Sequence, residues 1–270
     1  MRFHVVTLFP EAFEGATSYS ILGRAVHRGL VSVTVTDIRK FTFDRHGTAD
    51  DYQFGGGPGM VMKPEPIFRA VEDVLESLPP EEPDLIPILL MSPQGEQLNQ
   101  RLIDELAVAP DIVIVCGHYA GVDERIRTGL ATHEISIGDY VLTGGELAAM
   151  VVIDAVSRFI PDVVGSAENV HEDSITSGLL QHPLYTRPVE FRGMTTPEVL
   201  RSGNHAEIAR WRGRQQSLER TLRLRPDLLR FAELSNSDRI YLEQLGWSGE
   251  SGDPSNNPAD QARERQALDR

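Results

Sequence analysis

The chain has 270 residues and a formal net charge of −14, and hydrophobic residues make up 40% of it. This length suits one large domain or two ordinary ones, and the hydrophobic share suffices for a packed core, which excludes global disorder. The single cysteine excludes an intrachain disulfide and a four-cysteine zinc site.

Nothing in the sequence predicts export or membrane insertion. The opening run, MRFHVVTLFPEAF, lacks the charged start, the long apolar stretch and the cleavage site of a signal peptide. No segment approaches the roughly 20 apolar residues that span a bilayer. We therefore expect a cytoplasmic protein with no membrane partner. The acidic total argues weakly against nucleic acid, although a total can hide a local basic patch.

Strand-like and helix-like segments alternate through the first half of the chain. Apolar and β-branched runs predict strands at residues 4–9, 31–38, 86–92, 111–117 and 134–140. Helical spacing predicts helices at residues 10–30, 64–78, 98–107 and 146–159. The run at 111–117 is almost continuously apolar, which is typical of a parallel strand covered on both faces. The alternation predicts an α/β domain with a mostly parallel sheet.

The pattern changes beyond residue 160. Residues 161–178 are polar and mostly aperiodic, an arginine-rich helical region follows, and the last residues have the composition of a disordered tail. We predict an α/β domain at 1–162, a flexible linker at 163–179, a smaller helical domain at 180–247 and a tail at 248–270.

Four glycine-containing turns follow or border the predicted strands. They are YQFGGGPGM at 52–60, MSPQGE at 91–96, CGHYAG at 116–121 and LTGGE at 142–146. Ligands of open parallel sheets bind beyond the carboxyl ends of the strands, where glycine lets the backbone approach them. No turn matches GxxxxGK[ST] or GxGxxG after the first strand, so the ligand is not held mainly by phosphates. Each turn alone fits a tight packing corner at least as well, but together they favour one shared site.

Other reactive side chains have plainer interpretations. Cys116 ends a buried strand without an adjacent base, which favours a small buried hydrophobe over a nucleophile. The histidines show no metal-binding spacing. His171, Glu172 and Asp173 are consecutive, so their side chains diverge and do not favour a metal site. Composition alone favours a solvated charge or a helix cap at Asp173.

Residues 201–230 reverse the charge of the chain, because arginines there outnumber acids by more than two to one. Arg210, Arg214 and Arg220 are spaced to share one side of a helical path, with Trp211 between them. Arginine beside an aromatic ring suits RNA, whose phosphates it neutralises and whose unpaired bases stack. A surface helix with ion pairs to acidic residues explains the pattern equally well.

Several ordered motifs together resemble one family. They are LFPEAF, GRAVHRGL, DRHGTADD, FGGGPGM, SPQGE, VCGHYAGVDERI, SIGDYVLTGGELAAM, DAVSRFIP, LYTRPVEFRGM and SGNHAEIARWR. Over residues 1–230 the chain resembles the bacterial tRNA (guanine-N1)-methyltransferases of the SPOUT class. The resemblance implies an α/β fold whose parallel sheet ends in a deep C-terminal trefoil knot, followed by a smaller helical domain. It also implies methyl transfer from S-adenosylmethionine to N1 of guanosine 37 of tRNA, 3′ of the anticodon, by a homodimer whose active sites are shared between subunits.

The resemblance also implies roles for individual residues. Asp173 takes the place of the general base, and Arg158 that of an arginine that stabilises negative charge on guanine O6. The cofactor-binding residues are Met91, Ser92, Pro93, Gly95, Gly117, Tyr119, Gly121, Ile137, Gly138, Asp139, Tyr140, Val141, Leu142, Gly144 and Gly145. The RNA-binding residues are Arg187, Arg210, Trp211, Arg212, Arg214 and Arg220. Mg²⁺ is linked to the family, but no cluster of ligands fixes its place, so we predict no metal-binding residue.

The chain departs from the family at four positions that bear on guanine recognition. Ala120 stands where the family has a glutamate associated with the guanine site, and His118 where arginine is frequent. Gln181 and Leu184 replace a frequent aspartate and histidine. Two other functions stay open: a non-catalytic RNA-binding protein on the same fold, and a SPOUT methyltransferase that acts on another RNA. Retention of Asp173 and Arg158 argues against the first, and the WRGRQQSLERT segment argues against the second.

Overall fold

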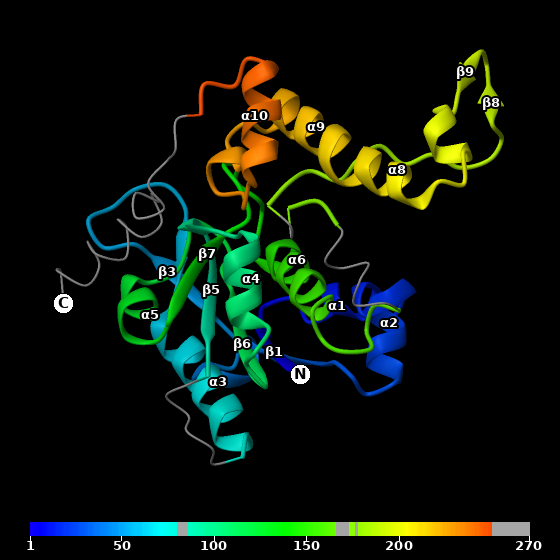
Figure 1. The fold of residues 1–270 in the computed structure, drawn as a ribbon. Coiled ribbons are helices and arrows are strands. Elements are labelled where there is room, and N and C mark those ends of the chain that lie inside the picture. The colour runs from blue at the N-terminus through cyan, green and yellow to red at the C-terminus, as the bar shows by residue number, and fades with distance from the viewer. Residues whose placement is uncertain (80–85, 166–172, 176–177, 250–270) are drawn as a thin grey trace. The chain divides into compact units, whose positions relative to one another are not determined.

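The computed structural model describes residues 1–79, 86–165, 173–175 and 178–249, with the backbone alone at 213–215 (Figure 1). The chain divides into two compact units, Met1–Ala167 and Glu168–Arg270. Within the described ranges, no helix is both long enough and apolar enough to cross a bilayer. The predicted tail lies outside these ranges from residue 250 onward.

The first unit is built on a five-stranded sheet in the order β2-β1-β6-β5-β7. Every pair of neighbouring strands is parallel, so the predicted α/β fold with a parallel sheet is confirmed. The strands are β1 (Arg2–Thr7), β2 (Ser32–Asp37), β5 (Ile88–Gln97), β6 (Asp111–Cys116) and β7 (His133–Ser136). A separate antiparallel hairpin joins β3 (Asp50–Tyr52) to β4 (Met60–Met62).

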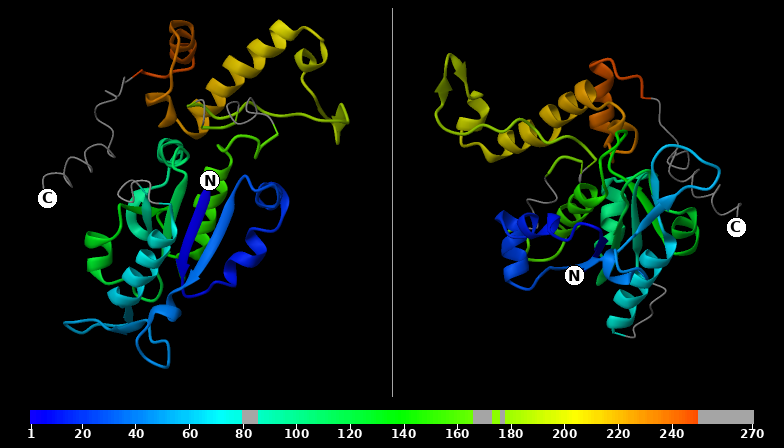
Figure 2. Two further views of the ribbon diagram at one scale, coloured as in Figure 1. Left: turned by 90° about the horizontal axis from the view of Figure 1, so that it is seen from below. Right: turned by 180° about the vertical axis from the view of Figure 1, so that it is seen from behind.

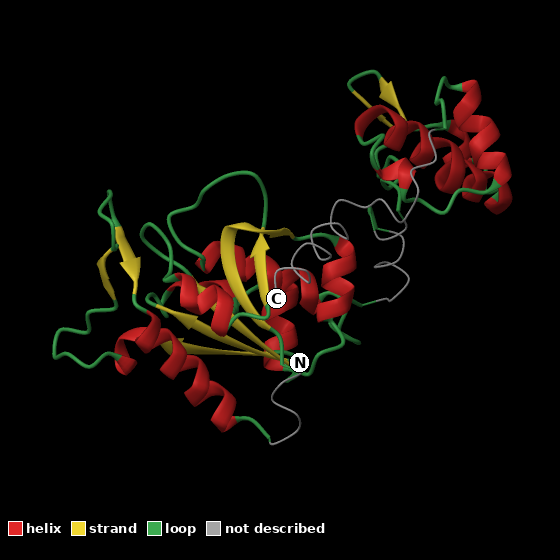
Figure 3. Ribbon diagram, turned by 90° about the vertical axis from the view of Figure 1, so that its left-hand side faces the viewer, coloured by secondary structure: helices red, strands yellow, loops and turns green. Residues whose placement is uncertain are grey.

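Helices cover both faces of this sheet (Figure 3). One face carries α1 (Ala12–Ala16), α2 (Ser20–His27), α4 (Gln100–Leu106) and α6 (Glu146–Ser157), and the other carries η1 (Ile38–Phe41), α3 (Pro64–Ser77) and α5 (Glu124–Gly129). Strand β6 shows why both faces are apolar. Ile112 and Ile114 belong to the core under α6, whereas Val113 and Val115 belong to the core under α3. Alternate side chains point to opposite faces, so a doubly covered strand must be apolar at every position.

Several features of the first unit differ from the sequence prediction. The strand predicted at 134–140 ends at Ser136, because the following residues form a turn rather than pairing with β5. The helix predicted at 10–30 is two helices, because Thr17 ends α1 with its hydroxyl bonded to Phe13 O at 3.0 Å and Tyr19 is extended. The β3–β4 hairpin and α5 were not predicted at all. β5 continues past its predicted end to Gln97, with a register shift against β7 between Met91 and Glu96.

The second unit is mostly helical. It contains the short hairpin of β8 (Glu190–Phe191) and β9 (Met194–Thr195), then η3 (Glu198–Arg201), α8 (His205–Arg210), η4 (Trp211–Gln216), α9 (Ser217–Leu224), η5 (Leu228–Arg230) and α10 (Asn236–Gln244). α8, η4 and α9 follow one another along one helical rod (Figure 2). A small core of Leu218, Leu229 and Leu242 joins α9 to α10.

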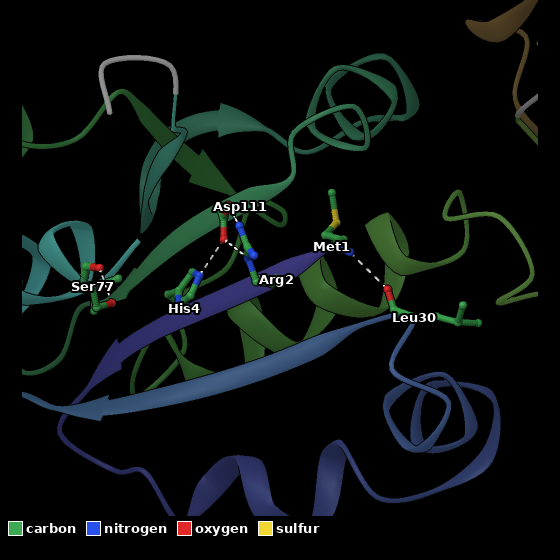
Figure 4. A network of polar contacts seen from close by, with 7 residues as sticks. Met1, Arg2, His4, Leu30, Ser77 and Asp111 are labelled. Carbon is green, nitrogen blue, oxygen red and sulfur yellow. Dashed lines mark hydrogen bonds and ion pairs between the residues drawn. The ribbon is translucent and has the colours of Figure 1, made fainter. Parts of the chain in front are cut away.

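A polar network ties together the amino ends of the two central strands β1 and β6 (Figure 4). Arg2 is the register partner of Asp111 and binds it through two hydrogen bonds of 2.6 Å. His4 Nε2 lies 3.0 Å from Asp111 Oδ1. Asp111 is almost fully buried, and its bonds to Arg2, followed by that to His4, hold its pKa below the ordinary value despite burial. The network therefore stabilises the end of the sheet opposite the loops that follow β5, β6 and β7.

Replacing Asp111 with Asn should lower the free energy of unfolding by about 2 kcal/mol at pH 7, since the charge-assisted bonds are lost. A carboxyl with a depressed folded pKa stabilises the fold above its unfolded pKa and loses that contribution as the pH falls through the folded value. The difference between variant and wild type should therefore shrink below about pH 4. Unfolding in urea, monitored by circular dichroism at several pH values, measures this difference in the free energy of unfolding. The exposed control Asp104→Asn should stay within about 0.5 kcal/mol of wild type, and a pH-independent loss in Asp111→Asn would contradict the account.

Candidate cofactor cavity and nucleic-acid surface

A cavity of about 290 Å³ opens at the carboxyl ends of β5, β6 and β7. Three segments line it: residues 91–94 within β5, where its register against β7 shifts, the loop 117–122 after β6 and the loop 137–145 after β7. Parallel strands bring these loops to one edge of the sheet, as expected for a ligand site of an open α/β fold. Three of the four glycine turns singled out in the sequence therefore meet at one place.

The fourth glycine turn does not line this cavity. Residues 52–60 connect β3 to β4, and they follow no strand of the large sheet. β4 instead runs beside the loop after β6, where Met62 N–H donates to Gly121 O at 3.0 Å. Ala120 N–H donates to Met60 O at 3.0 Å. The hairpin thus supports one wall of the cavity from behind.

The cavity gathers nearly all of the residues predicted to bind the cofactor. Those lining it are Met91, Ser92, Pro93, Gly117, Tyr119, Gly121, Ile137, Gly138, Tyr140, Val141, Leu142, Gly144 and Gly145. Gly95 and Asp139 are the two that do not. Asp139 lies within the loop after β7, but it is Gly138 and Tyr140 on either side of it that line the cavity. Gly95 packs behind the loop, where an added Cβ would lie 2.4 Å from the backbone of Glu134.

The sequence prediction missed about half of the lining. The additional residues are Leu90, Gln94, His118, Ala120, Val122, Glu124, Arg127, Glu134, Ile135, Ser136, Thr143 and Ala148. Most are neighbours of predicted residues in the same loops. Glu124 and Arg127 come from α5, a helix that the sequence interpretation did not include, although Asp123 accepts a hydrogen bond from Arg125 N–H at its start as a helix cap does.

The glycine pair of LTGGE forms a tight packing corner as well as a cavity wall. Gly145 N–H donates to Gly117 O at 2.8 Å, and an added Cβ there would lie 2.8 Å from Cys116 Cα. Only a residue without a side chain lets the two backbones approach so closely. The motif is therefore both a packing corner and part of a ligand site, because the close approach of Gly145 to the end of β6 shapes the cavity wall.

The loop after β7 is rigidly shaped and presents apolar side chains. Ser136 Oγ accepts from Gly138 N–H at 3.2 Å, and the Tyr140 hydroxyl donates to Ile137 O at 3.3 Å. Val141 is 81% exposed and Tyr140 55% exposed. A fixed loop with uncovered apolar walls and free main-chain groups suits a small ligand with a flat ring.

Charged groups stand at one side of the cavity. Arg127 donates to Glu124, and that hydrogen bond holds the pKa of the Glu124 carboxyl below its ordinary value. Arg125 likewise donates a hydrogen bond to Asp123, which holds the pKa of the Asp123 carboxyl below its ordinary value. Both carboxylates are therefore ionised at neutral pH. Arg127 and Arg125 offset these two charges, so the lining, which contains Glu124, Arg127 and Glu134, keeps one net negative formal charge. That charge favours a cationic ligand group over an anionic one.

Cys116 is a core residue, as the sequence favoured. It is fully buried among the apolar residues under α6. Burial, and then the nearby Glu146, raise the pKa of its thiol well above the ordinary value, so the thiol stays protonated and unreactive. Glu146 is held in turn by Thr7, whose hydroxyl donates to it at 2.6 Å.

The two predicted catalytic residues belong to different units. Arg158 caps the C-terminal end of α6, ten positions after Ala148 on the cavity wall and therefore about 15 Å further along the helix axis. Asp173 belongs to the second unit and directly precedes a turn in which Ser174 Oγ accepts from Gln181 N–H at 2.9 Å. The cavity and these two side chains are thus not brought together within the first unit.

No metal site emerges from the described ranges, where no group of three or more His, Cys, Asp and Glu residues could hold an ion. His171 and Glu172 lie outside the described residues.

The predicted RNA-binding residues lie along the helical rod of the second unit and the segment before it. Arg187, Arg210 and Arg212 are exposed, and Arg220 is half-buried on α9. Trp211 packs against the rings of His182 and Tyr185, with centroids 6.4 and 6.3 Å away. The side chain of Arg214 lies outside the described residues.

The π-helical turn η4 separates α8 from α9. It changes the angular spacing of the rod. The prediction that three arginines share one side had assumed ordinary helical spacing throughout.

Comparison with known proteins gives one consistent family. A family model described as tRNA (Guanine-1)-methyltransferase TrmD matches residues 1–231. A tRNA (guanine-N(1)-)-methyltransferase from Moorella thermoacetica is 56% identical over 245 residues, which cover 91% of this chain and 96% of that protein. Proteins of the same name from Dehalococcoides mccartyi (strain CBDB1) and Geobacillus kaustophilus are 54% and 50% identical, over 91% and 90% of this chain and 97% and 98% of their own. The chain therefore belongs to the tRNA (guanine-1)-methyltransferase family, of the SPOUT fold class that its motifs predict.

Proposed function

We propose that this protein transfers a methyl group from S-adenosylmethionine to N1 of guanosine 37 of tRNA, the nucleotide 3′ of the anticodon. The observation that carries this proposal is the cavity at the carboxyl ends of β5, β6 and β7, in a chain that belongs to this family. Thirteen of the 25 residues that line it are predicted by the family motifs to bind the methyl donor, and of the predicted set only Gly95 and Asp139 lie outside the lining.

The cavity suits S-adenosylmethionine in size and chemistry. Its volume of about 290 Å³ lies near the lower end of the range for small-molecule sites, roughly 300–1,000 Å³. Ile137 and Leu142, which both line the cavity, would supply apolar walls for the adenine ring. The charged side chains of the lining are Glu124, Arg127 and Glu134, and the one net negative formal charge that they leave suits the positively charged sulfonium end. When bound, the cofactor supplies an electrophilic methyl group.

The chemistry needs a base and a means of holding charge. Guanine N1 carries a proton in its neutral form, and that proton must leave for the nitrogen to attack the methyl carbon. The Asp173 carboxylate accepts the proton as the sulfur–carbon bond breaks and the nitrogen–carbon bond forms. Arg158 stabilises the negative charge that develops on guanine O6. Positioning supplies much of the remaining acceleration, with the target base extruded from its stack.

We further propose that the enzyme acts as a homodimer with shared active sites. Arg158 lies at the far end of α6 from the cavity of its own chain, so a second copy must bring an arginine to each cavity. The exposed side of α6 supports such an interface. Leu147 is 58% exposed and Val151 44% exposed, and they lie four positions apart on the exposed side of α6, which also carries the exposed Asp154. Adjacent exposed apolar side chains of this kind mark protein–protein contacts.

The remaining assignments follow from the same proposal. Residues 180–247 form the tRNA-binding domain, and residues 163–179 link it to the methyltransferase domain. A tRNA substrate places the reaction in the cytoplasm. The trefoil knot and a role for Mg²⁺ stay predictions.

Substitution of Asp173 by Ala should lower methyl transfer to tRNA at least about 100-fold, because a positioned general base contributes roughly 10²–10⁴. Affinity for S-adenosylmethionine, measured by calorimetry, should stay near that of wild type. The matched control Asp162→Asn removes an exposed acid of the same region and should transfer methyl at the wild-type rate. Wild-type turnover by Asp173→Ala would remove this residue from the mechanism.

Replacing Leu147 with Glu should dissociate the dimer, because a charge would be buried at the centre of the interface. Light scattering coupled to size exclusion should then give the monomer mass, and methyl transfer should be lost. Val108 provides the control: it is 84% exposed beyond α4, and Val108→Glu should leave both mass and activity unchanged. A Leu147→Glu variant that is still dimeric and active would contradict the proposed interface.

A further inference from the structure

A second cavity, of about 370 Å³, lies within the second unit. It is formed by the segment before β8, the residues that follow β9, and the start of η4. Its lining is His182, Pro183, Leu184, Tyr185, Thr186, Arg187, Val189, Thr196, Leu200, Arg201 and Arg212. Arg201 was not among the residues predicted to bind RNA, because it lies on the short helix η3, outside the run of arginines around Trp211.

Two folding features bring these side chains together. The segment that contains residues 180–187 runs beside the helical rod: Leu180 N–H donates to Thr221 Oγ1 at 2.9 Å, and further on Tyr185 packs against Trp211 (Figure 2). The β8–β9 hairpin then reverses the chain, and Thr196 N–H donates to Val189 O at 2.8 Å. This reversal brings η3, with Arg201, to the same cavity as Arg187.

The cavity is positively charged. Arg187, Arg201 and Arg212 are all exposed, and none of the described residues in its wall is acidic. Within the described part of the chain, no ion pair joins these three arginines to a carboxylate, whereas Arg225 nearby in sequence is paired with Asp227 at 2.6 Å. Surface ion pairing, the alternative explanation of the basic region, therefore does not account for them. Three guanidinium groups around one hollow are matched by an anion with several acceptor oxygens, such as a phosphate.

An aromatic surface lies beside this charge. Tyr185 is 50% exposed, and its ring lies near that of Trp211, with centroids 6.3 Å apart and a tilt of 52°, while the ring of His182 lies on Trp211 at 6.4 Å. A half-exposed tyrosine ring that packs against another ring is a platform on which an unpaired base can stack. The three arginines match the phosphate of a nucleotide, and the neighbouring tyrosine ring matches its base.

We propose that this cavity holds one unpaired nucleotide of the tRNA, with its backbone phosphate against Arg187, Arg201 and Arg212 and its base stacked on Tyr185. The inference rests on the proposed tRNA substrate and deepens it, since it assigns a single-nucleotide subsite to the second unit. Phosphate contact supplies affinity, and the stacked base selects an unpaired loop over a duplex stem.

The first test is the salt dependence of tRNA binding by the full chain, measured by fluorescence anisotropy with a labelled transcript. Each phosphate contact in a single strand adds about 0.7 to the slope of log K against log salt concentration. Arg201→Ala should therefore lower the slope by about 0.7 and weaken binding. Arg239→Ala, which removes an exposed arginine of α10 away from the cavity, should leave the slope unchanged.

The second test separates stacking from charge. Tyr185→Ala should weaken binding about tenfold, within the range of losses measured when a stacking side chain is removed, and should leave the salt slope at the wild-type value. Tyr185→Phe keeps the ring and should bind like wild type. Tryptophan fluorescence, from Trp211 and Trp247 in this unit, checks that each variant is folded.

The outcomes distinguish the subsite from the enzyme's function. If Arg201→Ala and Tyr185→Ala both bind tRNA like Arg239→Ala, the proposed subsite is overturned and the methyl transfer assignment stands. If both variants bind as expected but the wild-type protein transfers no methyl group to any tRNA, the subsite stands and the proposed activity fails.

Discussion

The close approach of Gly145 to the backbone of Cys116 and Gly117 is the contact on which the rest of the site depends. Strand β7 is at the edge of the sheet, and the chain that leaves it must return to the centre to begin α6. Gly145 makes that return possible, because any side chain there would collide with the end of β6. The loop is thereby held across the ends of β5 and β6, where it closes the cavity, and α6 starts between the sheet and solvent with Leu147 and Val151 uncovered.

Sequence alone predicted the parts of this site that follow from strand periodicity and the family motifs. A continuous apolar strand such as β6 predicts burial on both faces, and its end at Cys116 was predicted to within one residue. The strands β5 and β7, by contrast, end five residues after and four residues before their predicted ends. The β3–β4 hairpin was not predictable in the same way, because its strands are three residues long and take their stability from backbone bonds to the Ala120 loop. Arg201 was missed for a similar reason: only the reversal of the chain at β8–β9 brings it to the second cavity.

The distribution of charge explains how an acidic protein can bind RNA. At the first cavity Arg127 offsets Glu124, and the one net negative formal charge that remains in the lining suits a cationic methyl donor. In the second unit, Arg187, Arg201 and Arg212 surround a hollow that suits a phosphate, and no ion pair among the described residues joins them to a carboxylate. The net charge of −14 for the whole chain therefore does not predict the local charge at either cavity. Each unit carries the local charge that its own ligand requires, and long-range repulsion between an acidic surface and RNA is screened beyond about 8 Å at physiological ionic strength.

We propose that the cavity and the second unit act together to methylate guanosine 37 of tRNA. The most direct measurement is transfer of a radiolabelled methyl group from S-adenosylmethionine to an unmodified transcript with guanosine at that position, beside an otherwise identical transcript with adenosine there. The account predicts label on the guanosine transcript alone, even though Ala120 stands on the cavity wall where the family has glutamate. Absence of label on that transcript, while the protein still binds S-adenosylmethionine, would contradict it.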